Sequence, residues 1–252
     1  AQERKNLGKV YPLHINGKDL KTTKTLPRNN PSNSSEIIGQ ISLATIADAD
    51  LALNAAKEAY KTWRKVPALK RADLVDKVAE LMVRDRFKLI AQQVLEVGKP
   101  WAEADGDVAE AIDFCRYYAR DMRKLATPLK VGNVPGESSK YEYLSRGVNL
   151  VIAPWNFPLA ILCGMAAAAA VAGNTVIMKP AEQSSVVAHG LMELFKEAGF
   201  PNGVINFLPG LGEEVGDYLV KHPDITTIAF TGSKAVGLHI HREASTYRPG
   251  QQ

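Results

Sequence analysis

The chain has 252 residues, of which 46% are hydrophobic and 23% are charged, and its formal net charge is +4. This length can bury one large core or one and a half smaller ones, and the composition is that of a soluble globular protein. The lysines and arginines are scattered along the chain rather than gathered into a stripe, which argues against nucleic acid as a partner.

The apolar stretches and the cysteines indicate in which cellular compartment the chain is expected. The longest apolar stretch, 159–171, is mostly alanine and shorter than the roughly 20 residues of a membrane span, so it predicts a buried helix and no membrane partner. The polar segment Ala1–Lys9 has no apolar signal-peptide core. Cys115 and Cys163 are far apart in the sequence and form no CxxC pair, which argues against a zinc site or a disulfide framework. These features favour a reducing, cytoplasmic location.

Residues 1–127 are predicted to form an opening strand pair followed by helices. The strand pair is expected around 11–17, and the turn formers of 29–35 predict a loop. Asp48 is expected to cap a helix that reaches Trp63. Apolar residues at helical spacing predict two further helices, around 74–82 and 108–122.

Residues 128–146 have neither the helical apolar spacing of the preceding region nor the strand–helix alternation of the following one. Extended segments are expected around 131–136 and 140–144, which indicates a β-hairpin arm that leaves the main body.

Residues 147–252 alternate short apolar strands with helical stretches. Strands are predicted at 149–153, 175–178, 204–208 and 225–230. Helical crossovers between them imply an α/β fold with a doubly wound parallel sheet. Ligands of such sheets bind beyond the carboxyl ends of the strands, so the residues that follow each strand are the informative ones.

Three of these strand ends carry candidate chemistry, and the first two also have a plainer alternative. Asn156 lies between two prolines, where its amide could donate to a developing oxyanion or simply stabilise a turn. Lys179 and Glu182 could bind ribose hydroxyls, or they could be solvated surface charges. Gly232 and Ser233 open a predicted helix, whose positive end and backbone N–H groups suit a diphosphate.

In order and spacing, four segments resemble the aldehyde dehydrogenase superfamily: VIAPWNFP (151–158), GNTVIMKPAE (173–182), GVINFLPG (203–210) and IAFTGS (228–233). The resemblance spans essentially the whole chain. A narrower resemblance is to the branch that oxidises glutamate γ-semialdehyde, pyrroline-5-carboxylate dehydrogenase, as a single enzyme or as part of proline utilisation A. It is carried by YPLHING (11–17), VGKPWAE (97–103), AEAIDF (109–114) and EAGFP (197–201).

The resemblance implies NAD as the cofactor and assigns roles to residues of this chain. Asn156 would be the catalytic oxyanion-hole amide, and no metal would be bound. Lys179 and Glu182 would hold the adenosine ribose, and Glu182 would disfavour the 2′-phosphate of NADP because two negative charges would meet. The implied cofactor-binding residues are Ile152, Ala153, Pro154, Trp155, Lys179, Ala181, Glu182, Gly212, Gly216, Phe230, Thr231, Gly232, Ser233 and Val236.

The residues that perform the family's bond changes are absent from the chain. In the family, a cysteine thiolate attacks the aldehyde, and a glutamate-activated water later hydrolyses the thioester. The Glu-Leu/Met-Gly-Gly-Lys segment that carries this glutamate does not occur here. Cys115 and Cys163 are predicted to be buried structural thiols rather than substitutes for the nucleophile. We therefore expect an amino-terminal portion that does not oxidise aldehydes by itself.

Two functions remain open on this basis. The full-length protein would oxidise L-glutamate γ-semialdehyde to L-glutamate in proline catabolism, or the chain would be a non-catalytic nucleotide-binding or assembly module with the same fold. The resemblance also implies a homo-oligomer, with the 128–146 arm as its oligomerisation hairpin, and an unfinished sheet edge. His239 and His241 lie two residues apart and are predicted to face solvent without binding metal.

Overall fold

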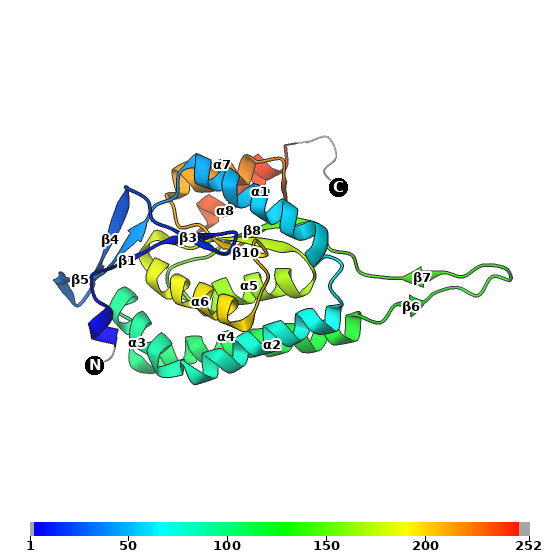
Figure 1. Cartoon of the computed structure of the whole chain (residues 1–252), viewed down its shortest axis with the longest axis horizontal. Helices are drawn as coiled ribbons and strands as arrows, with labels where there is room; N and C mark the ends of the chain where they lie inside the picture. The colour runs from blue at the N-terminus through cyan, green and yellow to red at the C-terminus, as the bar shows by residue number, and fades with distance from the viewer. Residues whose placement is uncertain (1–2, 247–252) are drawn as a thin grey trace.

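A six-stranded sheet with helices on both faces forms the centre of the chain in the computed structural model, which describes residues 3–246 (Figure 1). Its strand order is β11 (Ile225–Phe230), β8 (Val148–Ile152), β9 (Thr175–Lys179), β10 (Ile205–Phe207), β2 (Leu13–Ile15) and β3 (Lys18–Leu20). The first four strands are parallel, and β2 pairs with β10 in the antiparallel sense. The predicted parallel sheet is therefore confirmed, with an antiparallel hairpin added at one edge.

The helices cover the sheet in layers (Figure 1). One face carries α1 (Ile46–Trp63), α7 (Asp217–Lys221) and α8 (Lys234–Ala244). The other face carries α5 (Ala160–Val171) and α6 (Ser185–Ala198), which are covered in turn by α2 (Ala68–Arg84), α3 (Arg86–Val97) and α4 (Trp101–Leu125). Short helical turns are η1 (Glu3–Asn6), η2 (Glu182–Ser184) and η3 (Gly212–Gly216). Helices on both faces make the fold doubly wound, as predicted.

Helix α5 is buried because its small side chains allow neighbours to approach on all sides. It lies between the sheet and α4, and its alanines at positions 160, 166, 167 and 170 are fully buried. The Trp63 indole N–H, at the end of α1, donates to the carbonyl of Ala170 at 3.1 Å. The prediction of a buried helix in this stretch is confirmed.

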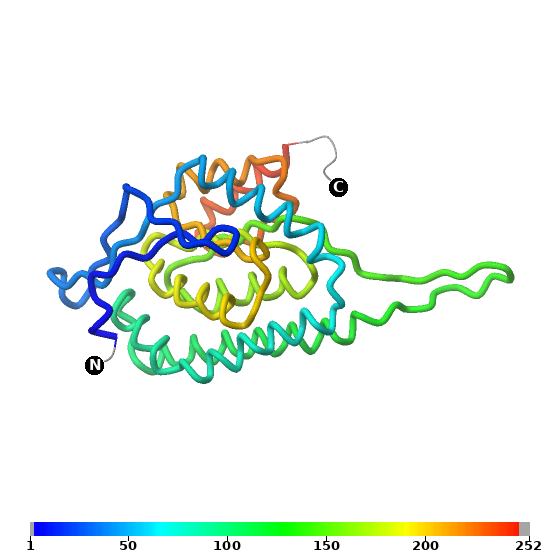
Figure 2. Tube along the Cα trace, in the orientation of Figure 1, coloured from blue at the N-terminus to red at the C-terminus, as the bar shows by residue number. Residues whose placement is uncertain are grey.

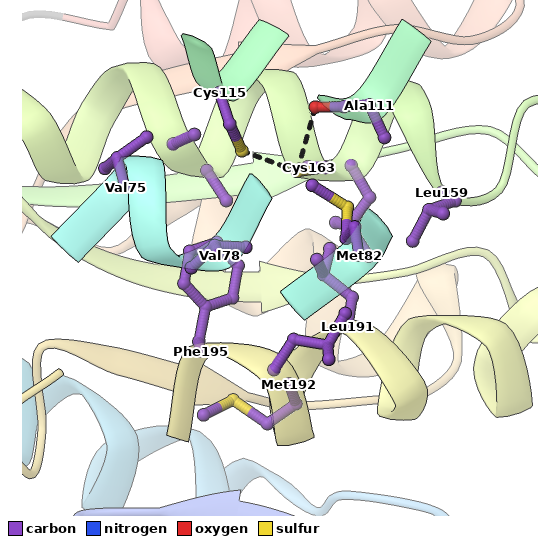
Figure 3. Packing of buried hydrophobic residues seen from close by; sticks show 14 of the residues in the cluster. Val75, Val78, Met82, Ala111, Cys115, Leu159, Cys163, Leu191, Met192 and Phe195 are labelled. Atoms are coloured by element: carbon purple, nitrogen blue, oxygen red, sulfur yellow. Dashed lines mark hydrogen bonds between the residues drawn. The ribbon is translucent and has the colours of Figure 1, made fainter. Parts of the chain in front are cut away.

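The two cysteines meet in the core between α4 and α5 (Figure 3). Their Sγ atoms are 3.4 Å apart, both side chains are fully buried, and both are free thiols. This contact could not be predicted from the sequence, because the two cysteines are 48 residues apart and meet only when α4 packs against α5. A hydrogen bond with Cys115 and burial raise the pKa of the Cys163 thiol well above its ordinary value, which agrees with the prediction of an inert structural thiol.

The predicted loop at 29–35 is wrong. Strands β4 (Thr25–Asn30) and β5 (Asn33–Ser42) form a hairpin there, and only residues 31–32 make the turn. Strand β1 (Lys9–Tyr11) pairs in parallel with β5 to complete a separate three-stranded sheet. Polar and turn-forming residues are tolerated in β4 and β5 because much of this hairpin faces solvent.

Two further predictions in the helical region are corrected. Helix α1 is capped by Thr45, and Asp48 is its third residue, which closes a reciprocal capping box with Thr45. Helix α3 was not predicted. Its buried face places the polar side chains of Gln92, Gln93 and Glu96 beside the apolar Leu89 and Ile90.

Residues 128–146 project from the body as a hairpin arm along the longest axis of the molecule (Figure 2). Its paired strands are only β6 (Leu129–Lys130) and β7 (Lys140–Tyr141), so the predicted strand at 131–136 is not formed. The arm exposes six large apolar side chains, those of Leu129, Val131, Val134, Tyr141, Tyr143 and Leu144. Residues 1, 2 and 247–252, at the outer ends of the first and last predicted regions, lie outside the described residues.

Across the described residues 3–246, none of the helices has both the length and the apolar character that crossing a membrane requires.

Candidate functional site

The carboxyl ends of β8, β9 and β11 border one cleft of about 1190 Å³. Because these strands are parallel, the residues that follow them reach the same edge of the sheet. The structure brings together at this cleft every residue that the sequence analysis named as catalytic or cofactor-binding: Ile152, Ala153, Pro154, Trp155, Asn156, Lys179, Ala181, Glu182, Gly212, Gly216, Phe230, Thr231, Gly232, Ser233 and Val236.

Lys179 and Glu182 form an ion pair in this cleft. Lys179 ends β9 and is 4% exposed, and its Nζ donates to Glu182 Oε1 at 2.9 Å and to the carbonyl of Pro180 at 3.3 Å. Gly212 lies opposite, where a Cβ atom would be 3.7 Å from Glu182 Oε1. The absence of a side chain at Gly212 keeps this part of the cleft open. A carboxylate held in this way can accept hydrogen bonds from ligand hydroxyl groups.

Asn156 lies in the exposed turn between β8 and α5. The turn is fixed from below by Asp107 of α4, which is 1% exposed. The Asp107 carboxylate accepts from the backbone N–H groups of Leu159 and Ala160, each at 3.2 Å, at the start of α5. Burial raises the pKa of Asp107, while nearby Lys99 and these two N–H groups oppose the rise. The turn that presents the Asn156 amide is thus tied to the helical layer.

The start of α8 supplies backbone donors to the cleft. Ser233 caps this helix, and its Oγ accepts from the N–H of Val236 at 3.3 Å. Gly232 is required for close packing, because a Cβ atom there would lie 2.7 Å from Cζ of Phe230. The positive end of α8 and its unpaired N–H groups therefore border the cleft, an arrangement that suits an anion.

The cleft also contains residues that the sequence analysis missed. They are Gln183, Glu213, Asp217, Val220, Lys221, Ala235, His239 and Ile240. Two of these residues could have been found from their spacing. Val220 lies four residues after Gly216, and Ile240 lies four residues after Val236, and residues four apart lie on the same face of a helix.

The side chain of His239 is 40% exposed, in keeping with the prediction, but it also has a partner that the sequence did not predict. His239 lines the cleft, and its Nε2 lies 2.7 Å from Asp217 Oδ1. Nothing in the local sequence pairs these two residues, because they lie on different helices. His241, by contrast, is exposed. Within residues 3–246, no three His, Cys, Asp or Glu side chains are grouped so that they could hold a metal ion.

Comparisons with known proteins match this geometry to one family. The model of the aldehyde dehydrogenase family matches residues 19–250. The 1-pyrroline-5-carboxylate dehydrogenase of Geobacillus sp. (strain WCH70) is 47% identical over 245 residues, which are 97% of this chain and 48% of that relative. The chain thus spans about half the length of the curated relatives that it matches.

Two solved structures are similar over the whole chain. Proline utilization A from Bdellovibrio bacteriovorus, inactivated by N-propargylglycine, has 65% sequence identity and a TM-score of 0.97, with 26% of that protein covered. The Thermus 1-pyrroline-5-carboxylate dehydrogenase with bound NAD has 49% identity and a TM-score of 0.97, with 49% covered. On the extent of these matches, together with the fold and the cleft, the chain belongs to the aldehyde dehydrogenase family.

Proposed function

We propose that the full-length protein oxidises L-glutamate γ-semialdehyde to L-glutamate with NAD, as a step of proline catabolism, and that this chain supplies its cofactor site. The observation that carries the proposal is the meeting of Asn156, Lys179, Glu182 and Ser233 at one cleft. The names of the relatives, 1-pyrroline-5-carboxylate dehydrogenase and proline utilization A, support the choice of substrate.

The residues of the cleft fit a dinucleotide. Lys179 and Glu182 would hold the adenosine ribose, and Ser233 would contact the pyrophosphate. Gly212 and Val236 would border the adenine at the open position described above. A cleft of about 1190 Å³ is large enough for a ligand of this size. Bound NAD supplies an acceptor for two electrons.

Glu182 supports NAD rather than NADP as the cofactor. Its carboxylate is held against Lys179 Nζ at 2.9 Å. A 2′-phosphate on the ribose would bring a second negative charge to the same place, and the ammonium group is already paired.

Asn156 would act on the aldehyde oxygen. Its side-chain amide would donate a hydrogen bond to that oxygen as negative charge develops there, and such donors typically contribute 10²–10³-fold to the rate. Pro154 and Trp155 would shape the channel beside the nicotinamide. The chain holds neither the family's glutamate segment nor an accessible cysteine, so by itself it would bind NAD without oxidising aldehyde.

The test compares the full-length gene product with the 252-residue chain. We expect NADH release from the full-length protein with glutamate γ-semialdehyde to exceed that with simple aliphatic aldehydes. The 252-residue chain should bind NAD in calorimetry and release no NADH. Full-length protein that binds NAD but oxidises none of these aldehydes would support a non-catalytic nucleotide-binding module instead.

We further propose that the full-length protein is a homo-oligomer and that the 128–146 arm contributes to its assembly. The exposed apolar side chains of the arm support this, because an isolated hairpin needs a surface on which to pack.

A further inference from the structure

The part of the cleft between η3, α7 and α8 has two uncharged walls and a polar rim. We call it the inter-helix slot. Its walls are residues repeated at four-residue spacing, Gly212, Gly216 and Val220 on one side and Val236 and Ile240 on the other. Its rim is formed by Asp217, Lys221 and His239.

A hydrogen-bond chain crosses this rim from α8 to α7. Arg242 Nη2 lies 3.0 Å from His239 Nδ1, and His239 Nε2 lies 2.7 Å from Asp217 Oδ1. Because a guanidinium group only donates, Nδ1 must accept, and Nε2 then carries the proton that is donated to Asp217. In this tautomer both ring nitrogens of His239 have a partner.

A second contact joins the same helices one turn further on. Lys221 Nζ lies 2.6 Å from Asp217 Oδ2 and 3.8 Å from Glu243 Oε2. Hydrogen bonds from Lys221 and His239 hold the pKa of Asp217 below its ordinary value, so the carboxylate is ionised at neutral pH. Two polar links, Asp217–His239 and Lys221–Glu243, therefore connect α7 to α8.

Apolar packing alone holds α8 weakly. Among residues 3–246, Ile240 is the one buried residue of this helix. Exposed ion pairs are individually weak, but a connected network with short bonds contributes more than an isolated pair. The short Asp217–His239 bond is therefore the stronger of the two polar links that fix the position of α8, and the 3.8 Å Lys221–Glu243 pair adds less.

We infer that the Asp217–His239 bridge fixes α8 relative to α7 and so holds the two walls of the inter-helix slot in place for the adenine. The inference rests on the proposed function, in which Gly212 and Val236 border the adenine. His239 is a positioning residue in this account, because it acts through α8 and touches no reacting group.

The first experiment measures ligand affinity of the 252-residue chain by calorimetry, with NAD and AMP as probes. His239→Leu should weaken the binding of both by about fivefold, the loss that corresponds to roughly 1 kcal/mol. His239→Gln should restore most of the affinity, because glutamine Nε2 is as many bonds from Cα as histidine Nε2 and also donates. His241→Leu, on the same helix but outside the cleft, should bind both ligands as the unaltered chain does.

The second experiment is a double-mutant cycle. If the bridge is responsible, Asp217→Ala and His239→Leu together should weaken NAD binding no more than either change alone. Urea unfolding of each variant without ligand separates a loss of the slot from a loss of the fold. Unchanged affinity in His239→Leu, no rescue by His239→Gln, or additive losses in the cycle would overturn the inference while the proposed cofactor site stands. If the unaltered chain binds neither NAD nor AMP, the proposed cofactor site fails, and the role of the bridge fails with it.

Discussion

Glu182 is a carboxylate with one defined partner, Lys179, at the floor of the cleft. If it rejects the 2′-phosphate, Glu182→Gln should raise NADP affinity relative to NAD affinity by roughly tenfold, because one negative charge is removed without a change of shape. Calorimetry with both dinucleotides measures the ratio. Glu214→Gln, a neighbouring carboxylate outside the cleft, is the control, and an equal ratio in both variants would contradict the assignment.

Glu96 is a second carboxylate whose surroundings are unusual. It is fully buried on α3, and it accepts from the backbone N–H groups of Val186 and Val187, each at 2.8 Å, at the start of α6. Burial raises the pKa of Glu96 to about 7, although the two N–H groups and Arg28 oppose the rise. The folded chain therefore holds this proton more tightly than the unfolded chain does.

The raised pKa of Glu96 predicts a pH dependence of stability. Its contribution is fully present below the unfolded pKa of 4.5 and is lost as the pH rises toward 7, so the free energy of unfolding should fall by about 2 kcal/mol between pH 5 and pH 7 from this group. Urea unfolding at both pH values measures the change. In Glu96→Gln this part of the slope should disappear, whereas exposed Glu103→Gln should keep it; equal slopes in all three proteins would refute the prediction.

Asn156, Lys179 and Ser233 were singled out because each lies at or just beyond the carboxyl end of a strand in a parallel sheet, where strand ends meet. Their roles toward substrate and cofactor come from the family resemblance and stay a prediction. Asp217 and His239 were not found, because their contact depends on how α7 and α8 lie in space. The same reason hid the contact of Cys115 with Cys163.

At the scale of elements, α5 depends on a cap from another helix. It has no side-chain cap of its own, and Asp107 of α4 accepts from its first backbone N–H groups. Asp107→Ala should lower the free energy of unfolding by about 2–3 kcal/mol, because two buried N–H groups lose a charged acceptor. The midpoint of urea unfolding measures the loss. Asp113→Ala, an exposed change on the same helix, should stay within about 0.5 kcal/mol of the unaltered chain. An equal effect of the two changes would argue against the cap.

Elements were predicted well where burial leaves a periodic apolar pattern. Helices α1, α2 and α4 have such patterns, whereas α5 and the strands β8, β9 and β10 are short stretches that are buried almost continuously. Helix α3 buries Leu89 and Ile90, but Gln92, Gln93 and Glu96 also face inward, and the hydrogen-bond partners of Glu96 lie far away in the sequence, at the start of α6. The β4–β5 hairpin was missed because residue types that usually form turns lie within its exposed strands.

At the scale of the whole molecule, we expect that the arm can be removed without loss of the core, because residues 129–144 are exposed. Replacing residues 129–144 by a short Gly/Ser linker should leave the free energy of unfolding of the 252-residue chain within about 0.5 kcal/mol, because the replaced side chains are largely exposed. The same change in the full-length protein should reduce the mass measured by light scattering if the arm joins subunits. An unchanged mass would place assembly elsewhere.

A thin hairpin along the longest axis also affects how the molecule moves through water (Figure 2). The arm adds friction out of proportion to its mass, so a single chain should diffuse and sediment more slowly than a sphere of equal volume. An arm that lies against another subunit would lose most of this drag. Tumbling rate therefore reports on whether the hairpin is extended into solvent or covered.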